Sequence, residues 1–270
     1  RLGAIVTCAA NANDEARGMS IPYGLASQIG TDARLGLVVL QSDETMESEL
    51  RQALPGGDVA AFVSRIPSAA EVSNDSLAAM EADLPRAAGL LPKTVNFDVV
   101  GYGCTSASSV IGTQRVAELV SAGCTSTQVT DPVSALVAAC AAVGVSKLAL
   151  LTPYTEEVSE SLRSALAAKG IETPVFGTFN EPVETKVARI DPRSIRDAAI
   201  ELGKDKGAEA VFMSCTNLRS FGIIENVETG CSKPAFSSNQ ALFWHMFALA
   251  GIIAARRDGM LWQTNLHGAS

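Results

Sequence analysis

Two short segments place a cysteine directly after an apolar run and directly before hydroxyl or amide side chains. They are Gly103-Cys104-Thr105-Ser106 and Ser214-Cys215-Thr216-Asn217. The runs before them, Asp98-Val99-Val100-Gly101-Tyr102 and Ala210-Val211-Phe212-Met213, are short and, after Asp98, uncharged, as is typical of buried parallel strands. A thiol at a strand's carboxyl end lies where open α/β sheets bind ligands, and N–H groups and the dipole of a following helix favour the thiolate there. We therefore expect the two thiols to face one small molecule from opposite sides.

A free cysteine is most often a small buried hydrophobic residue, and either cysteine taken alone favours that interpretation. Their equivalent positions in a repeated order of elements favour chemistry instead. The other cysteines lack this context and are interpreted as structural or incidental: Cys8, Cys124, Cys140 and Cys231.

The side chains that follow the two cysteines carry the donors that a carboxylate needs. Thr105, Ser106, Thr216 and Asn217 could bind such a group, and all four residue types are also preferred helix N-caps. Both roles can hold at once, because an unoccupied cap can serve as an anion site.

Two further polar segments follow predicted strands and belong to the same sheet edge. Gln41 and Asp43 come after the strand that ends at Leu40. Asp43 would suit an ammonium or hydroxyl group better than an anion. Tyr154 follows a strand in the second half of the chain, where its hydroxyl either binds a ligand or lies in water.

Strand and helix patterns alternate from Arg34 onward, which indicates an α/β fold. The predicted strands are 35–40, 59–66, 98–102, 127–130, 147–151, 173–179 and 210–213. The predicted helices are 42–54, 73–91 with Pro85 inside it, 110–122, 133–143, 152–169, 192–206 and 240–255. The elements form two series, each ending in a strand that carries Cys-Thr.

This repeated order predicts two similar, pseudo-symmetric parallel-sheet halves with the active site in the cleft between them. We expect residues 34–144 plus 235–270 to form the first half and residues 145–234 the second, with the final helix packed back on the first half. The role of residues 1–33 stays open, although Arg1 to Val6 has the pattern of a strand.

The composition narrows the functional classes. The chain has 270 residues, of which 47% are hydrophobic and 19% charged, and its net charge is −8. Without a cluster of lysines and arginines, neither nucleic acid nor an anionic membrane is an expected partner. The cysteines lack C-x-x-C spacing and only two histidines are present, so we expect a reduced, cytoplasmic protein without a metal site.

No motif for a nucleotide or another cofactor is present, so none is expected. The apolar stretch 241–255 is too short to cross a bilayer and is interpreted as a buried helix. Residues 1–33 show no evident signal peptide.

Taken together, these residues resemble the aspartate/glutamate racemase superfamily, and more closely its maleate cis–trans isomerase and arylmalonate decarboxylase branch. The resemblance covers most of residues 34–252. The segments that carry it are Arg34-Leu-Gly-Leu-Val-Val-Leu-Gln-Ser-Asp-Glu-Thr-Met-Glu, Tyr102-Gly103-Cys104-Thr105-Ser106, Leu151-Thr152-Pro153-Tyr154-Thr155 and Ser214-Cys215-Thr216-Asn217. It implies a cofactor-independent enzyme in which Cys104 is the nucleophile or first acid/base and Cys215 its partner, and it assigns the neighbouring polar side chains to substrate carboxylates. It also implies that a homo-oligomer can form.

The chain departs from the maleate isomerase pattern at two substrate contacts. Asp43 stands where that pattern has an asparagine, and Val183-Glu184 stands where it has Asp-Asn. Both changes are toward an acid. We expect a maleate isomerase-like enzyme acting on a small carboxylate, with a two-thiol amino-acid racemase as the alternative. An arylmalonate-type decarboxylase and a non-catalytic small-anion binder are minor alternatives, the former because the decarboxylases keep only one cysteine of the pair.

Overall fold

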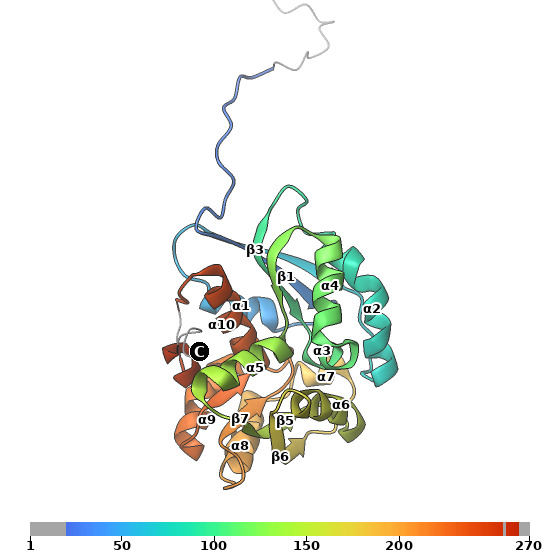
Figure 1. The fold of residues 1–270 in the computed structure, drawn as a ribbon, viewed down its shortest axis with the longest axis vertical. Coiled ribbons are helices and arrows are strands. Elements are labelled where there is room, and N and C mark those ends of the chain that lie inside the picture. Colours follow the sequence, from blue (N-terminus) through green and yellow to red (C-terminus); the bar gives the residue numbers. More distant parts are fainter. Residues whose placement is uncertain (1–19, 256–257, 265–270) are drawn as a thin grey trace, which may run out of the picture.

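The strands form two four-stranded sheets in which every neighbouring pair is parallel (Figure 1). The computed structural model describes residues 20–255 and 258–264. The strands are β1 (Ala33–Leu40), β2 (Val59–Ile66), β3 (Phe97–Gly103), β4 (Ser126–Thr130), β5 (Lys147–Thr152), β6 (Glu172–Thr178), β7 (Ala210–Met213) and β8 (Ala235–Ser237). The sheet orders are β2-β1-β3-β4 and β6-β5-β7-β8, so the predicted pair of similar α/β halves is confirmed.

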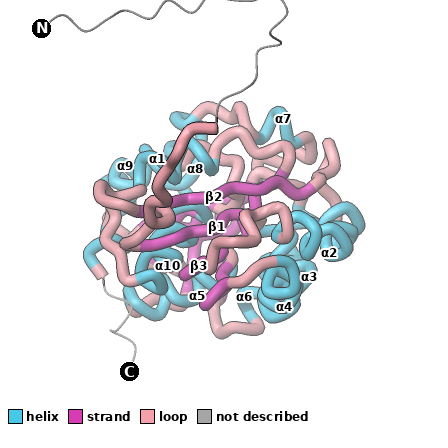
Figure 2. Tube along the Cα trace, turned by 90° about the horizontal axis from the view of Figure 1, so that it is seen from above, coloured by secondary structure: helices cyan, strands magenta, loops and turns pink. Residues whose placement is uncertain are grey.

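The helices lie on both faces of the sheets. They are α1 (Met46–Ala53), α2 (Asn74–Ala88), α3 (Thr105–Ile111), α4 (Thr113–Gly123), α5 (Pro132–Val143), α6 (Glu156–Ala167), α7 (Glu184–Val187), α8 (Pro192–Gly203), α9 (Ile224–Cys231) and α10 (Ser238–Ala250), with short 3-10 helices η1 (Phe221–Ile223) and η2 (Met260–Gln263). Helices α1, α5 and α10 pack on one face of the first sheet, and α2 and α4 pack on the other. Figure 2 shows β2, β1 and β3 of that sheet side by side.

The parallel register brings the loops that carry the predicted site residues to one edge of each sheet. In the first sheet Val39 pairs with Gly103, so the loop after β1 begins next to Cys104. In the second sheet Leu151 pairs with Met213, which places the end of β5 next to the Cys215 loop. In both sheets the loops that follow the two central strands therefore lie next to each other, at the carboxyl ends of the strands.

The two halves share their hydrophobic cores. One cluster of buried side chains contains Val100 of the first sheet and Val211 of the second. The other contains Leu37 of the first sheet and Phe212 of the second. Because both apolar clusters draw on both sheets, the halves are packed together rather than joined by a flexible linker.

The C-terminal part of the chain divides between the halves differently from the expectation. Strand β8 pairs with β7 and belongs to the second sheet, whereas residue 235 was expected to begin the return to the first half. Helix α10 does pack on β3 and α5, as predicted. None of the helices within residues 20–255 and 258–264 has the length and hydropathy needed to span a bilayer.

Two helix predictions near the cysteines need correction. A single helix was expected at residues 110–122; residues 113–122 do lie in α4, but residues 110–111 end α3, and Gly112, with a φ of 93°, separates the two helices. A helix was also expected directly after Cys215, but the chain there forms a loop until η1. Pro85 lies inside α2 and does not break it, since it falls in the last turn. The N-terminal run Arg1 to Val6 lies outside the described residues.

Helices α2 and α4 are in close contact at Gly123. A Cβ atom there would lie 2.3 Å from the carbonyl oxygen of Pro85 and 2.7 Å from the Cβ of Ala88. We expect Gly123→Ala to lower the free energy of unfolding by about 1–3 kcal/mol in urea denaturation, because the backbone of α2 must shift. Gly222→Ala is the matched control, since a Cβ there meets nothing within 4 Å. Equal stabilities for the two variants would contradict this packing.

Candidate active site

The two cysteines are buried at the carboxyl ends of β3 and β7, where the sequence predicted them. Cys104 caps α3, and its sulfur accepts a hydrogen bond from the N–H of Ala107 at 3.4 Å. Cys215 has a φ of 123°, a conformation that side-chain-bearing residues rarely adopt. Its N–H donates to Ser238 Oγ at 3.0 Å, and its sulfur accepts from the N–H of Asn217 at 3.3 Å. These bonds hold the strained backbone in place.

Hydroxyl groups join the two cysteine loops across the interface between the halves. Thr105 Oγ1 donates to Ser238 Oγ at 2.8 Å, and the same Ser238 oxygen accepts from Cys215. Thr216 Oγ1 donates to the carbonyl oxygen of Gly103 at 3.2 Å. The sequence predicted that Thr105 and Thr216 bind a carboxylate, but the structure uses both hydroxyls to hold the two loops together.

Ser106 does not take part in the link between the two cysteine loops, unlike Thr105 and Thr216. It is buried, and within the described part of the chain its hydroxyl has no hydrogen-bond partner. Its backbone N–H stabilises the Cys104 thiolate. Ser106 therefore stays a candidate for substrate binding.

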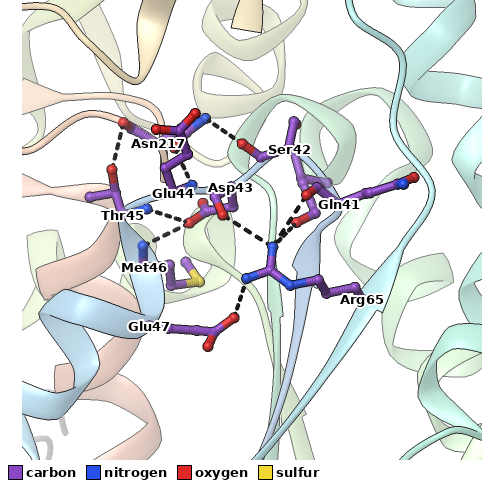
Figure 3. A network of polar contacts seen from close by, with 10 residues as sticks. Gln41, Ser42, Asp43, Glu44, Thr45, Met46, Glu47, Arg65 and Asn217 are labelled. Carbon is purple, nitrogen blue, oxygen red and sulfur yellow. Dashed lines mark hydrogen bonds and ion pairs between the residues drawn. The ribbon is translucent and has the colours of Figure 1, made fainter. Parts of the chain in front are cut away.

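Asn217 connects the loop after β1 to the Cys215 loop (Figure 3). Its Oδ1 accepts from the N–H of Glu44 at 2.9 Å, and its Nδ2 donates to the carbonyl of Ser42 at 3.3 Å. The same Nδ2 donates to Glu184 Oε2 at 3.0 Å. Both amide hydrogens of Asn217 are thus engaged within the protein, so the predicted donation to a substrate is not what the structure shows.

Asp43 and Gln41 lie in the same loop but point in different directions (Figure 3). Asp43 is buried; its Oδ1 accepts from the N–H groups of Thr45 and Met46 at the start of α1, and its Oδ2 has no partner. Burial raises the pKa of Asp43 to about 6, against the lowering effect of those N–H groups. Gln41 is exposed and its side chain turns away from Asp43 and Asn217, so its role in substrate binding stays a prediction.

Tyr154 lies next to the second thiol, as predicted. Its hydroxyl is 3.1 Å from Cys215 Sγ and donates a hydrogen bond to Glu184 Oε1. Glu184, the first residue of α7, is 1% exposed. Tyr154 and Asn217 therefore both donate to the same buried carboxylate.

Glu184 was absent from the site residues expected from the sequence. No spacing or periodicity distinguishes it, and it stood out only as a departure from the asparagine of the maleate isomerase pattern. That departure was the signal that could have placed it in the site.

A small cavity lies beside Cys104, Tyr154 and Glu184. Its volume is about 20 Å³, room for about one water molecule. The rest of its wall comes from Leu40 and from the connection between β2 and α2 together with the start of α2: Ser68, Ala69, Glu71, Val72, Ser76, Leu77 and Met80. Backbone bonds hold this connection to the second half, because Val72 N–H donates to Pro182 and Glu184 N–H donates to Ala70.

The environment of both thiols opposes ionisation, contrary to the expectation of a favoured thiolate. Burial, opposed by the N–H of Ala107 and assisted by the charges of Glu184 and Asp43, raises the pKa of Cys104 to about 12. Burial and then Glu184 hold the pKa of Cys215 well above its ordinary value. In this structure the thiols are protonated near neutral pH.

A second buried carboxylate, Glu49, lies behind the site. It accepts from Phe221 N–H at 3.1 Å and from Asn239 Nδ2 at 2.6 Å, and Asn239 also donates to the carbonyl of Thr216 at 2.8 Å. Glu49 thereby ties α1 to the Cys215 loop and to α10. Burial raises its pKa to about 7.

The described residues include no cluster of three histidine, cysteine, aspartate or glutamate side chains that could hold a metal ion. The five described cysteines are free thiols. Cys8 lies outside the described residues.

Comparisons with known proteins agree on one family. Residues 35–261 match the family model of arylmalonate decarboxylase. The maleate isomerase of Pseudomonas putida is 27% identical over 228 residues, 79% of this chain and 90% of that protein. The arylmalonate decarboxylase of Bordetella bronchiseptica is 31% identical over 121 residues, 44% of this chain and 50% of that protein.

A solved structure has the same fold. The maleate cis–trans isomerase of Nocardia farcinica bound to Tris is 25% identical and has a TM-score of 0.75, covering 85% of this chain and 97% of that chain. A mutant of that isomerase, at 24% identity and the same TM-score of 0.75, carries a covalently bound succinylcysteine intermediate.

The raised pKa of Glu49 predicts a pH-dependent stability. The pKa rises from 4.5 to about 7 on folding, so the folded state binds the proton more tightly and loses stability as the pH rises through this range. We expect the free energy of unfolding to fall by about 3 kcal/mol between pH 4.5 and pH 8 on account of Glu49, with Asp43 adding to the lower part of the range.

Denaturant titrations over this pH range check the prediction. Glu49→Gln should show a flatter profile, whereas Glu157→Gln, which changes an exposed acid, should keep the wild-type slope. If Glu49→Gln has the wild-type slope, Glu49 is not the titrating group.

Proposed function

The chain belongs to the arylmalonate decarboxylase family, and on that premise we propose that it is a cofactor-independent cis–trans isomerase that acts on a small carboxylate through Cys104 and Cys215. The observation that carries the proposal is the pair of buried cysteines at equivalent positions after β3 and β7. The maleate isomerase relative from P. putida matches over most of both chains.

Cys104 is the residue that we propose attacks the alkene. As a thiolate it forms a bond to one alkene carbon, and the π electron pair moves onto the other carbon, next to a carbonyl group. The carbon–carbon bond is then single and rotates. When the electron pair returns, the bond to sulfur breaks and the same thiolate leaves. The succinylcysteine in the N. farcinica isomerase mutant supports a covalent step of this kind.

Cys215 and Tyr154 face this chemistry from the second half. Tyr154 donates its hydroxyl hydrogen to Glu184, so its oxygen can accept from the Cys215 thiol 3.1 Å away. We assign to Cys215 the stabilisation of the negative charge that develops on the second alkene carbon. This assignment needs both thiols, which is why the decarboxylase alternative receives less support.

Substrate must displace part of the cavity wall before reaction. The cavity of about 20 Å³ is too small for a four-carbon acid. The exposed part of the wall is residues 69–71 of the connection between β2 and α2, so we propose that this part moves while the bonds from Tyr154 and Asn217 keep the Glu184 side chain in place. Opening this wall also admits water, which lowers the desolvation that keeps the thiols protonated.

A racemase is the alternative that a specific observation favours. Asp43 Oδ2 is buried without a partner and would accept a hydrogen bond from the ammonium group of an amino acid. The two thiols would then exchange a proton with the α-carbon from opposite faces, rather than form a covalent bond.

We also propose a cellular compartment and an assembly state for the enzyme. The free thiols of the described cysteines support a reduced compartment, and we propose the cytoplasm. A net charge of −8 argues against nucleic acid and anionic membranes as partners. Assembly into a homo-oligomer is proposed from the family alone.

Proton NMR in D₂O tests the activity directly. Candidate substrates are cis-alkenoic acids, aspartate, glutamate and an arylmalonate. We expect a trans-alkene free of deuterium at carbon, and we expect Cys104→Ser to lower the rate by about 10³-fold or more because the nucleophile is lost. Cys215→Ser should also be strongly impaired, and Cys124→Ser, which changes a thiol outside the site, should keep the wild-type rate.

Other outcomes point to the alternatives. Deuterium entering an α-position establishes racemase chemistry, and carbon dioxide release establishes decarboxylation. Full turnover by Cys104→Ser refutes the nucleophilic role. If no candidate reacts but one binds, the protein is a small-anion binder.

A further inference from the structure

Glu184 accepts the hydrogen bonds that a substrate carboxylate was expected to accept. Tyr154 donates to its Oε1 and Asn217 donates to its Oε2, and the sequence had predicted both residues as carboxylate ligands. Glu184 is buried and lines the cavity beside Cys104. One of the protein's own carboxylates therefore fills a position suited to an anion.

The position of Glu184 is fixed from several sides. Its backbone N–H donates to Ala70 O, its side chain has two donors, and the loop that carries Asn217 is tied to the loop after β1. If the side chain moved away, its charge and two buried donors would all need new partners, which is costly in a buried site. A substrate must therefore bind with Glu184 in place.

The cavity would repel a second negative charge. Among the described residues that line it, two are glutamates, Glu71 and Glu184, and none is lysine, arginine or histidine. Asp43 adds a third acid close enough to influence Cys104. Among the other polar groups of the wall, the Ser76 hydroxyl is engaged at the start of α2, whereas the Ser68 hydroxyl, which accepts from Ser42 N–H, can donate to one carboxylate.

We propose that the substrate carries a single carboxylate and presents a hydrogen-bond donor, an amide or ammonium group, to Glu184 in place of a second carboxylate. Each carboxylate oxygen has two lone pairs, and the bonds from Tyr154 and Asn217 use one on each oxygen. A free lone pair can accept the substrate's N–H. The inference rests on the proposed isomerase function, since it names the substrate class for the same two thiols.

Three probes of nearly equal shape test this proposal. Maleate is a dianion, its monoamide is a monoanion with a donor, and its monomethyl ester is a monoanion without one. We expect the wild-type kcat/KM for the monoamide to exceed that for maleate and for the ester by at least about tenfold. Of the three probes, only the monoamide has an N–H group that can donate to the Glu184 carboxylate.

Two variants locate the cause of this preference. Glu184→Gln offers an amide donor in place of the carboxylate, so its kcat/KM for maleate should rise relative to that for the monoamide by at least about tenfold. Glu157→Gln removes the same charge from an exposed residue outside the cavity wall and should keep the wild-type preference. Thermal unfolding shows whether each variant is folded, and the comparison of the three probes on the wild-type protein stands without any variant.

Binding measured by calorimetry on Cys104→Ser separates this inference from the proposed activity. Tighter binding of the monoamide without turnover by the wild-type protein supports the role of Glu184 and refutes the isomerase. Equal use of maleate and the monoamide by the wild-type protein overturns the inference and leaves the isomerase intact. Equal use of the ester and the monoamide overturns the requirement for a donor.

Discussion

The side chain of Asn217 is the interaction on which the arrangement of the site depends. Its oxygen binds a backbone N–H of the loop after β1, and its two amide hydrogens bind a carbonyl of the same loop and the carboxylate of Glu184. A buried amide with its donors and acceptor all paired has one position with low free energy. The two sheets share apolar cores, which do not specify hydrogen-bond geometry, so this amide supplies the alignment between the loops.

The site concentrates negative charge where a protein ordinarily avoids it. Asp43, Glu49 and Glu184 are all buried, and the charge of Glu184 helps to raise the pKa values of both thiols. Such an arrangement costs stability and suppresses the reactive form of the cysteines. A ligand whose N–H or O–H groups donate hydrogen bonds to these carboxylates would offset the cost of their burial when it binds.

The sequence predicted what depends on local pattern. Short uncharged runs located β3 and β7, and their repetition predicted two similar sheets with a cysteine after each. The partners of Thr105 and Thr216 could not be predicted, because they lie 133 and 113 residues away along the chain and depend on how the halves meet. The polar side chain of Gln41 made it a candidate site residue. Its outward direction could not be predicted, because it depends on the path of the backbone after β1. Spacing and periodicity do not distinguish Glu184, since its role comes from Tyr154 and Asn217 converging on it; only its departure from the maleate isomerase pattern marked it.

Ser238 connects both cysteine loops and begins α10, a helix that packs on the first sheet directly after a strand of the second. Ser238 is translated after both thiols. A nascent chain that contains Cys104 and Cys215 but not yet Ser238 therefore lacks one of the links between the two loops, and the bridge from Thr105 through Ser238 to Cys215 forms only once the start of α10 has been synthesised.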